Sequence, residues 1–177
     1  MKTVHPGRWR AKLEKDQPAK IVPVPPKWQR QYGRGTMLIS RPIDVDWLIR
    51  KVRKGRLTTP TLIRERLARD YGAENACPLC TGIFIRIVAE AAEEDRRARK
   101  GRITPYWRVV QSDGSLYTKF PGSAAAQARH LRTEGFVIAA AKGRKPRFDC
   151  ACRRRPIVVR IPRSVPPCWP SRVSPRR

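Results

Sequence analysis

The chain has 177 residues, which is enough for one ordinary domain with terminal extensions. Its 40 Lys and Arg residues against 14 Asp and Glu residues give a formal net charge of +26. That excess favours a polyanionic partner, because phosphate contacts release counterions; a solubilising charge or a ribosome-associated tail is the alternative. No apolar run is long enough to cross a bilayer, so we expect no membrane partner.

The first ten residues are basic, at Lys2, Arg8 and Arg10, but no apolar segment follows them. We therefore expect no secretory signal. Five cysteines in such a chain indicate reduced thiols in a cytosol-like compartment. The expected location is cytoplasmic, in association with the bacterial nucleoid.

Residues 1–40 are basic, interrupted by proline and marked by spaced aromatic side chains. The stretch 18–26 cannot be helical, because proline removes hydrogen-bond donors and restricts the residue before it. We interpret the whole segment as an extended N-terminal arm. Its aromatic residues either stack on nucleic-acid bases or pin the arm onto its own domain, and the second interpretation is favoured for Trp9, Trp28 and Tyr32.

Residues 41–141 carry the patterns of a mainly α-helical domain with a small β wing. The first helix is expected to begin at a cap formed by Asp44 and to stop at Gly55. In the second helix, Thr59 is the N-cap before a proline and Gly72 ends the helix. The inner faces of these two helices consist of Val45, Leu48, Ile49, Val52, Leu62, Ile63 and Leu67.

A third helix is expected after Pro78 and Thr81. Its apolar stripe leaves out Ile85, Arg86 and Ala89 and consists of Phe84, Ile87, Val88 and Ala91. Two helices with a connection containing glycine and proline, the second with an arginine on its outer face, fit a helix-turn-helix. A plain helical hairpin is the alternative. The charge run at 93–102 is expected to be a solvated helix end and loop.

A short β-hairpin is predicted next in the chain. Residues 107–111 have the pattern of a strand, and residues 115–117 return as a second strand. Between them, Asp113-Gly114 is a strong two-residue turn signal. This hairpin would be the wing of a winged helix-turn-helix.

The last part of the chain changes from helical to tail-like composition. Ser123 is expected to cap a helix over 124–133, and residues 136–140 are apolar enough for a closing strand. Residues 142–177 are rich in Arg and Pro and cannot bury enough apolar surface to offset their ordering entropy. We expect a largely disordered tail that adds phosphate binding, with a short edge strand at Val158-Val159 as the one exception.

The segment 103–114 reads Ile-Thr-Pro-Tyr-Trp-Arg-Val-Val-Gln-Ser-Asp-Gly. It resembles the active-site signature of the O6-alkylguanine-DNA alkyltransferases, Pro-Cys-His-Arg-Val-Val followed by a glycine turn. Residues 55–59 match that family's entry into its first DNA-binding helix, and residues 86–92 match its recognition helix. The glycine loop and the Leu-x-x-x-Glu-Gly ending correspond to Gly122, Gln127, Leu131, Glu134 and Gly135.

This series of segments covers residues 43–138 in the family's order. The match is closer to alkyltransferase-like members that lack the acceptor cysteine, and to a bacterial branch with Pro-Tyr-Trp-Arg and the run Cys-Pro-Leu-x-Thr-Gly-Ile-Phe. That run is present here at 77–84.

The resemblance implies a winged helix-turn-helix that enters the minor groove of double-stranded DNA and flips a guanine into a pocket. Arg86 matches the arginine that fills the vacated space, and a solvated surface cation is its alternative role. The residues expected at the DNA are Thr58, Thr59, Arg86, Ala89 and Arg108. Those expected around the flipped base are Pro105, Tyr106, Trp107, Gly122 and Glu134.

The chain departs from the family at the reactive position. Tyr106 stands where the alkyl-accepting cysteine would be, and Trp107 stands where the neighbouring histidine would be. A phenol with a pKa of about 10 is a poor alkyl acceptor, and an indole is no base at neutral pH. Glu134 therefore has no histidine to orient, and Glu90 adds an anion on the expected DNA side.

We therefore predict a monomeric, non-enzymatic DNA-repair protein that recognises alkylated or damaged guanine and holds it for downstream repair proteins. Tyr106 either packs against the alkylated base or, together with Trp107, fills a closed pocket as a core aromatic.

The cysteines keep two further alternatives open. Cys77, Cys80, Cys150 and Cys152 form a CxxC and a CxC pair that could together bind zinc, although we expect no cofactor. Cys77 or Cys80 could also serve as a displaced alkyl acceptor in an active methyltransferase. A third possibility is a sequence-independent architectural protein whose tails dominate binding.

Overall fold

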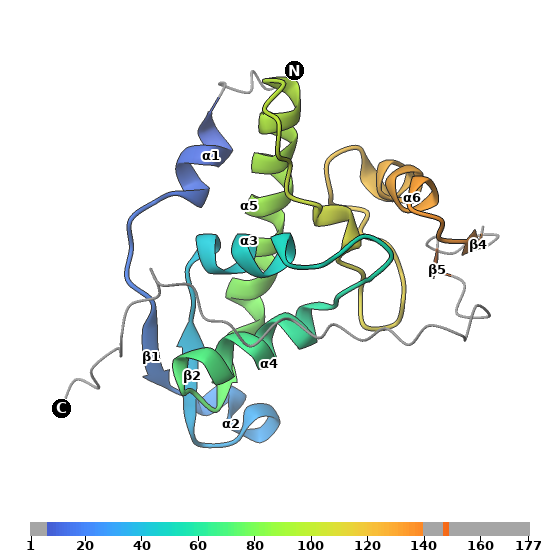
Figure 1. The fold of residues 1–177 in the computed structure, drawn as a ribbon. Helices are drawn as coiled ribbons and strands as arrows, with labels where there is room; N and C mark the ends of the chain where they lie inside the picture. Colours follow the sequence, from blue (N-terminus) through green and yellow to red (C-terminus); the bar gives the residue numbers. More distant parts are fainter. Residues whose placement is uncertain (1–6, 140–146, 149–177) are drawn as a thin grey trace.

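The computed structural model describes residues 7–139 and 147–148. Within these residues the protein is mainly helical, and a small three-stranded sheet lies beside the helices (Figure 1). The elements in chain order are α1 (Arg8–Leu13), β1 (Lys20–Pro23), α2 (Pro26–Tyr32), β2 (Thr36–Ile39), α3 (Pro42–Arg50), α4 (Pro60–Tyr71), β3 (Asn75–Ala76), α5 (Pro78–Arg97), the 3-10 turn η1 (Tyr106–Arg108), α6 (Ser123–Thr133), β4 (Ile138–Ala139) and β5 (Arg147–Phe148).

Helix α5 is the centre of the structure, since α1, α3, α4 and η1 all contact it. Ile85, Val88 and Ala89 on α5 are buried in the main hydrophobic core, together with Leu48 and Ile63 from the neighbouring helices. The prediction that Ile85 and Ala89 lie off the apolar stripe is therefore wrong. A helix enclosed by partners on several sides buries a wider arc than a single stripe.

The three-stranded sheet has the order β1-β2-β3, with β1 antiparallel and β3 parallel to β2. The stretch at 18–26 is non-helical, as predicted, and contains β1. The segment interpreted as an extended arm nevertheless holds α1 and α2 as well, and it packs on the body of the protein. Trp9 lies against the main core, and Trp28 and Tyr32 lie against a smaller cluster around Met37 and Cys77.

The start of α3 differs from the prediction, whereas the start of α4 agrees with it. Asp44 is the third residue of α3, where its carboxylate accepts from the Arg41 backbone N–H (3.0 Å) and from the Tyr71 hydroxyl (2.8 Å). The helix begins earlier because proline suits its first position. The N-cap at Thr59 is confirmed, since its hydroxyl accepts from the Leu62 backbone N–H at 3.3 Å.

The mainly helical fold class is confirmed, but the two strands predicted at 107–111 and 115–117 do not form in the described structure. What remains of the hairpin is a turn in which the Gln111 N–H donates to the Ser115 carbonyl at 3.0 Å. The first half of the predicted hairpin forms η1 instead, and Val109 pairs in parallel with Thr58. The Thr58 N–H donates to the Arg108 carbonyl and the Val110 N–H donates to the Thr58 carbonyl, both at 2.9 Å. These contacts with a distant segment take the backbone groups that a hairpin partner would need. The tight turn survives, with Gly114 at φ +79.

The C-terminal part is described as far as β4, with β5 paired antiparallel to it. Helix α6 begins within one residue of the expected cap, and β4 lies inside the predicted closing strand.

The charge run at 93–102 is more ordered than predicted, because α5 continues to Arg97 and buries Glu93 and Asp95. Most of the predicted tail, including Val158-Val159, lies outside the described residues. None of the described helices is both long and apolar enough to span a bilayer.

Candidate functional site

The reactive position expected from the motif is occupied by a buried tyrosine. Tyr106 is 1% exposed, and its hydroxyl donates to Glu93 Oε1 on α5 at 2.9 Å. Its ring makes edge-to-face contacts with Phe120 and Trp107, with centroid distances of 5.4 and 5.5 Å. Burial, followed by the charge of Glu93, raises the pKa of the Tyr106 phenol above its ordinary value. The side chain at this position is therefore a protonated phenol at neutral pH.

Glu93 is the acceptor that fixes this phenol. Burial acts to raise the pKa of Glu93, but hydrogen bonds from Arg96 and Tyr106 outweigh it and hold the pKa below its ordinary value. The Glu93 carboxylate is thus ionised and shared between a surface guanidinium and a buried hydroxyl. This pairing ties η1 to α5 in the core.

Trp107 and Arg108 both bind the carboxylate of Glu134. The indole Nε1 of Trp107 donates to Glu134 at 2.7 Å, and Arg108 donates from Nε at 3.0 Å and from Nη2 at 2.9 Å. Burial acts to raise the pKa of Glu134, but these hydrogen bonds hold it below the ordinary value. The Trp107 ring also stacks on His130, with centroids 4.4 Å apart. Glu134 therefore orients an indole and a guanidinium.

The Arg108 guanidinium is engaged inside the protein. The side chain is only 14% exposed, and besides Glu134 it donates to the Val52 carbonyl. Its donors point into the protein and hold η1 against the end of α3. In this structure the residue is a positioning group rather than a phosphate contact.

The other residues expected at the DNA separate into buried positions and one exposed position. Thr58 and Ala89 are fully buried, and Thr59 is the buried cap of α4. The Thr58 hydroxyl has no hydrogen-bond partner among the described atoms. Arg86 alone of this group is exposed, at 55% of its side chain, and its ion pair with Glu90 is long, at 3.9 Å.

The remaining pocket residues support the backbone around Tyr106. Pro105 is buried directly before it. Gly122 has φ +68, and a Cβ there would lie 2.7 Å from the Ala126 Cβ, so glycine is needed for this turn. Gln127 was not among the predicted site residues, yet its buried amide donates to the carbonyls of Trp107 and Val109 at 3.0 and 2.7 Å. The signal for it was a polar residue on the apolar face of α6.

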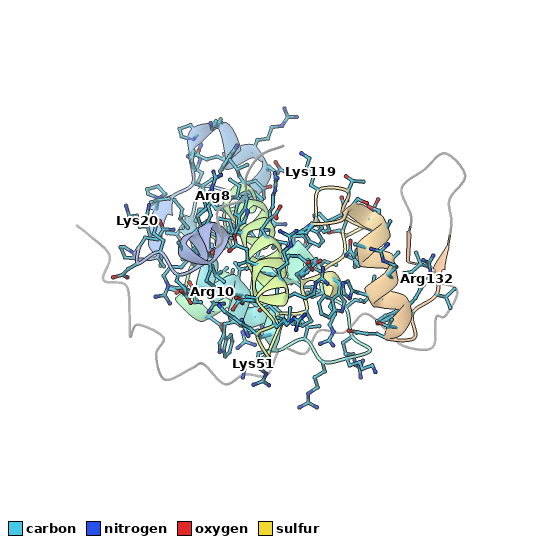
Figure 2. The ribbon with its side chains drawn as sticks, turned by 90° about the horizontal axis from the view of Figure 1, so that it is seen from above. Arg8, Arg10, Lys20, Lys51, Lys119 and Arg132 are labelled. Carbon is cyan, nitrogen blue, oxygen red and sulfur yellow. The ribbon has the colours of Figure 1, made fainter. Side chains whose placement is uncertain are left out.

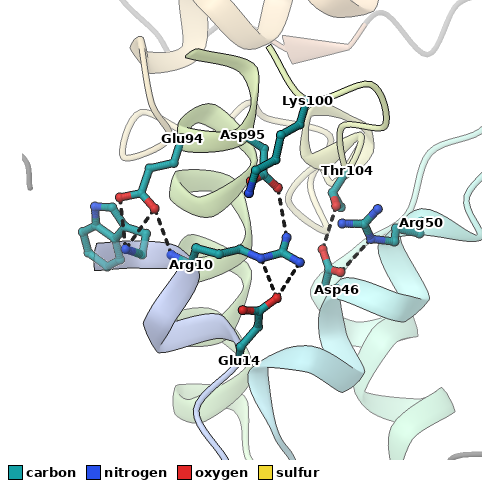
Figure 3. Close-up of polar contacts among 9 residues, drawn as sticks. Arg10, Glu14, Asp46, Arg50, Glu94, Asp95, Lys100 and Thr104 are labelled. Carbon is teal, nitrogen blue, oxygen red and sulfur yellow. Dashed lines mark hydrogen bonds and ion pairs between the residues drawn. The ribbon is translucent and has the colours of Figure 1, made fainter. Parts of the chain in front are cut away.

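Two carboxylates that follow Glu93 in the C-terminal half of α5 hold α1 in place (Figure 3). The Glu94 carboxylate accepts from the backbone N–H groups of Trp9 and Arg10 at 3.0 and 2.9 Å. The Arg10 guanidinium and the Lys100 ammonium both pair with Asp95, at 2.9 and 2.8 Å. These acidic groups are structural partners of the protein's own cations and backbone.

Cationic side chains are distributed around the molecule. Figure 2 shows labelled cations from α1, β1, the end of α3 and α6 on several sides of the ribbon. Net charge by itself therefore selects no single binding face. Arg86 is distinguished from the other exposed arginines of α5 by its immediate surroundings.

Cys77 and Cys80 are both free thiols at the start of α5. Cys77 is the buried N-cap, and its Sγ accepts from the Cys80 backbone N–H at 3.4 Å. Burial, followed by the hydrogen bond with Cys77, raises the pKa of Cys80 to about 12. Across residues 7–139 and 147–148, no three His, Cys, Asp or Glu side chains are grouped as metal ligands. Cys150 and Cys152 of the zinc alternative lie outside the described residues.

The fold and site thus define a mainly helical protein whose central helix exposes Arg86, with a buried phenol at the position where the motif resemblance places a thiol. No family model and no curated protein matches the sequence. The crystal structure of S. pombe Atl1 in complex with damaged DNA containing O6-carboxymethylguanine is similar to this chain, with a TM-score of 0.41 and 18% identity over 62% of this chain and 89% of that one.

Atl1 is an alkyltransferase-like protein, so the chain is similar to a member of the family that its motifs resemble.

Proposed function

We propose that this chain binds double-stranded DNA and recognises alkylated or otherwise damaged guanine by base flipping, without transferring the alkyl group. The observation that carries the proposal is the contrast between two residues of the same motif series. Arg86 projects from α5 into solvent, whereas Tyr106 is buried and protonated. A chain with a net charge of +26 supplies the attraction to phosphate.

Recognition would use Arg86 as the group that replaces the extruded base. A guanidinium is planar and cationic, so it can stack and hydrogen-bond inside a duplex. Extrusion costs a few kcal/mol of stacking and pairing, and it costs least for a mispaired or damaged base. Preference for a lesion therefore needs no chemistry at the base.

The absence of transfer follows from the groups around Tyr106. Its phenol is held protonated by burial and by Glu93, and Trp107 offers Glu134 an indole N–H rather than a base. Because the buried Tyr106 ring leaves no room for a base at its own position, we propose that the extruded base stacks on the half-buried rings of Trp107 and His130. Bases stack on such aromatic rings in proteins that bind unpaired nucleotides.

The test compares duplexes that carry either O6-methylguanine or guanine at one position, at near-physiological salt. The proposal predicts tighter binding of the modified duplex by wild type, and loss of most of that difference in Arg86→Ala. Intact mass after incubation should show no added methyl group. Equal affinities for the two duplexes would reject lesion recognition.

A displaced cysteine is the enzymatic alternative. The raised pKa of Cys80 disfavours a thiolate at neutral pH. A mass gain of one methyl group that disappears in Cys80→Ser would establish this alternative instead.

Tail-driven architectural binding is the remaining alternative, motivated by the charge of the chain. Under that alternative, deletion of 142–177 abolishes binding, whereas our proposal predicts only a shallower salt dependence.

We further propose that the protein acts as a monomer and holds the lesion for downstream repair proteins, which a pull-down on lesion-bearing DNA would identify.

A further inference from the structure

Helix α5 carries an exposed apolar pair beside Arg86. Leu79 and Ile83 are 61% and 50% exposed. They precede Arg86 by seven and three positions, so all three side chains lie along one face of the helix. The opposite face of α5, at Thr81, Phe84, Ile85 and Val88, is buried in the core.

Such a pair stands out in the described structure. The other exposed large apolar side chains there are Ile43, on α3, and Val137, in the loop before β4. Gly82 sits exposed between Leu79 and Ile83, and a Cβ built on it would meet no atom within 4 Å. The helix backbone is therefore open to close approach at this point.

The face of α5 that carries Leu79 and Ile83 is covered by another element only nearer the C-terminus of the helix. Glu94 receives the N-terminus of α1, and Figure 1 shows α1 beside the C-terminal part of α5. None of the described elements covers Leu79 and Ile83 in this way, and both side chains remain exposed. The uncovered part of the face ends at Arg86, whose partner Glu90 is 3.9 Å away.

We propose that Leu79 and Ile83 form an apolar wedge that enters a DNA groove beside Arg86, with Ile83 pressing against a base step and kinking the duplex. This inference rests on the proposed function and adds how that surface deforms DNA. Apolar side chains next to arginines are used in this way by minor-groove proteins, which partly unstack a step to gain contact area. DNA is the occupant favoured here because a guanidinium continues the same face in a chain of charge +26.

Salt dependence separates an apolar contact from a charged one. Removing a phosphate contact lowers the magnitude of the salt slope of log K by about 0.9. Removing an apolar contact lowers affinity by a similar factor at every salt concentration, because it releases no counterion. Ile83→Ser is therefore expected to weaken binding about tenfold with an unchanged slope.

The experiment measures affinity against salt, and duplex bending by end-to-end energy transfer, for the full chain on an unmodified duplex. Ile83→Ser and Leu79→Ser should lose affinity and bending, and Arg86→Ala should lower the salt slope. The control is Val137→Ser, which removes an equally exposed side chain (56%) far along the chain. Thermal unfolding checks that each variant folds. We expect them to fold, because the substituted side chains are exposed.

The inference is overturned if both serine variants bind and bend DNA as wild type does. It is also overturned if sedimentation shows a dimer that Ile83→Ser dissociates while DNA affinity is unchanged, since the face would then be occupied by a second copy. These outcomes are distinct from failure of the proposed function. That function fails if wild type does not prefer O6-methylguanine, even where Ile83→Ser abolishes bending.

Discussion

The two halves of α5 use their polar and apolar residues in opposite ways. In the C-terminal half, Glu93, Glu94 and Asp95 are all engaged by the protein's own groups. In the N-terminal half, the outer face presents Leu79 and Ile83 to solvent, with no ion pair on that stretch until the long contact of Arg86. The same helix therefore stabilises the fold at one end and presents a surface at the other.

The chain has 14 acidic residues against 40 basic ones, and several of the acidic residues on α5 are used to stabilise the fold. Glu93, Glu94 and Asp95 are paired with backbone N–H groups, a buried phenol and cations nearer the surface, and a buried charge is costly to leave unpaired. Removing these carboxylates should therefore affect folding, whereas changes at the exposed end should affect binding and leave folding nearly intact.

The largest effect is expected at Tyr106. Tyr106→Ala removes a fully buried ring and should lower the free energy of unfolding by about 3–5 kcal/mol. Tyr106→Phe keeps the ring, leaves Glu93 without its buried donor and should cost about 1–2 kcal/mol. Urea unfolding of the two variants gives both values. A loss below about 1 kcal/mol for Tyr106→Ala would mean that the ring is not packed as described.

The next effect concerns the attachment of α1. Glu94→Ala removes the carboxylate that accepts from Trp9 and Arg10, so α1 should open locally at a cost of about 1 kcal/mol. Amide hydrogen exchange at Trp9 and Arg10 should accelerate, while exchange in α4 stays unchanged. Glu65→Ala, at an exposed carboxylate of α4, is the matched control. Unchanged exchange at Trp9 in Glu94→Ala would contradict this contact.

A third prediction concerns acid stability. The folded-state pKa of Glu134 is lowered, so its ionised form stabilises the protein above the unfolded-state value of about 4.3, and this contribution is lost as the pH falls through the folded-state pKa. Glu134→Gln should therefore lower stability at neutral pH and give a shallower loss in acid. Urea midpoints measured across the acid range check the sign. An equally steep acid limb in the variant would contradict it.

The smallest effect is expected at Glu90, the anion beside Arg86. Glu90→Gln removes a charge that repels phosphate, and it should tighten DNA binding roughly two- to fivefold at low salt, with less effect at high salt. Burial raises the pKa of Glu90, so the gain should also shrink as the pH falls toward that pKa and the wild-type side chain becomes neutral. Fluorescence anisotropy at several salt concentrations measures it. Weaker binding by the variant would place Glu90 away from the DNA.

The sequence predicted α4 well because the signals at its two ends are local, whereas it missed α1 and α2 in the segment interpreted as an arm. Thr59 with its following proline, and Gly72, mark the ends of α4 within a few residues of the chain. The exposure of Arg86 followed from its position off the apolar stripe. The same stripe failed for Ile85 and Ala89, because the elements that enclose α5 come from other parts of the sequence.

The predicted wing failed for a similar reason. Residues 107–111 have a strand pattern, but Thr58 takes the backbone groups around Val109 and η1 replaces the strand. The burial of Arg108 depended on Glu134 and Val52, which are 26 and 56 positions away. No local pattern distinguishes an arginine that faces a carboxylate inside the protein from one that faces a phosphate.

The most direct measurement compares two exposed arginines of α5: Arg86, near the middle of the helix, and Arg97, at its C-terminal end. Each change to alanine removes one positive charge from the same helix, so bulk electrostatics are matched. We predict that Arg86→Ala strongly weakens binding to an O6-methylguanine duplex at near-physiological salt and that Arg97→Ala has little effect. Equal losses in the two variants would contradict a DNA-binding surface at the N-terminal half of α5.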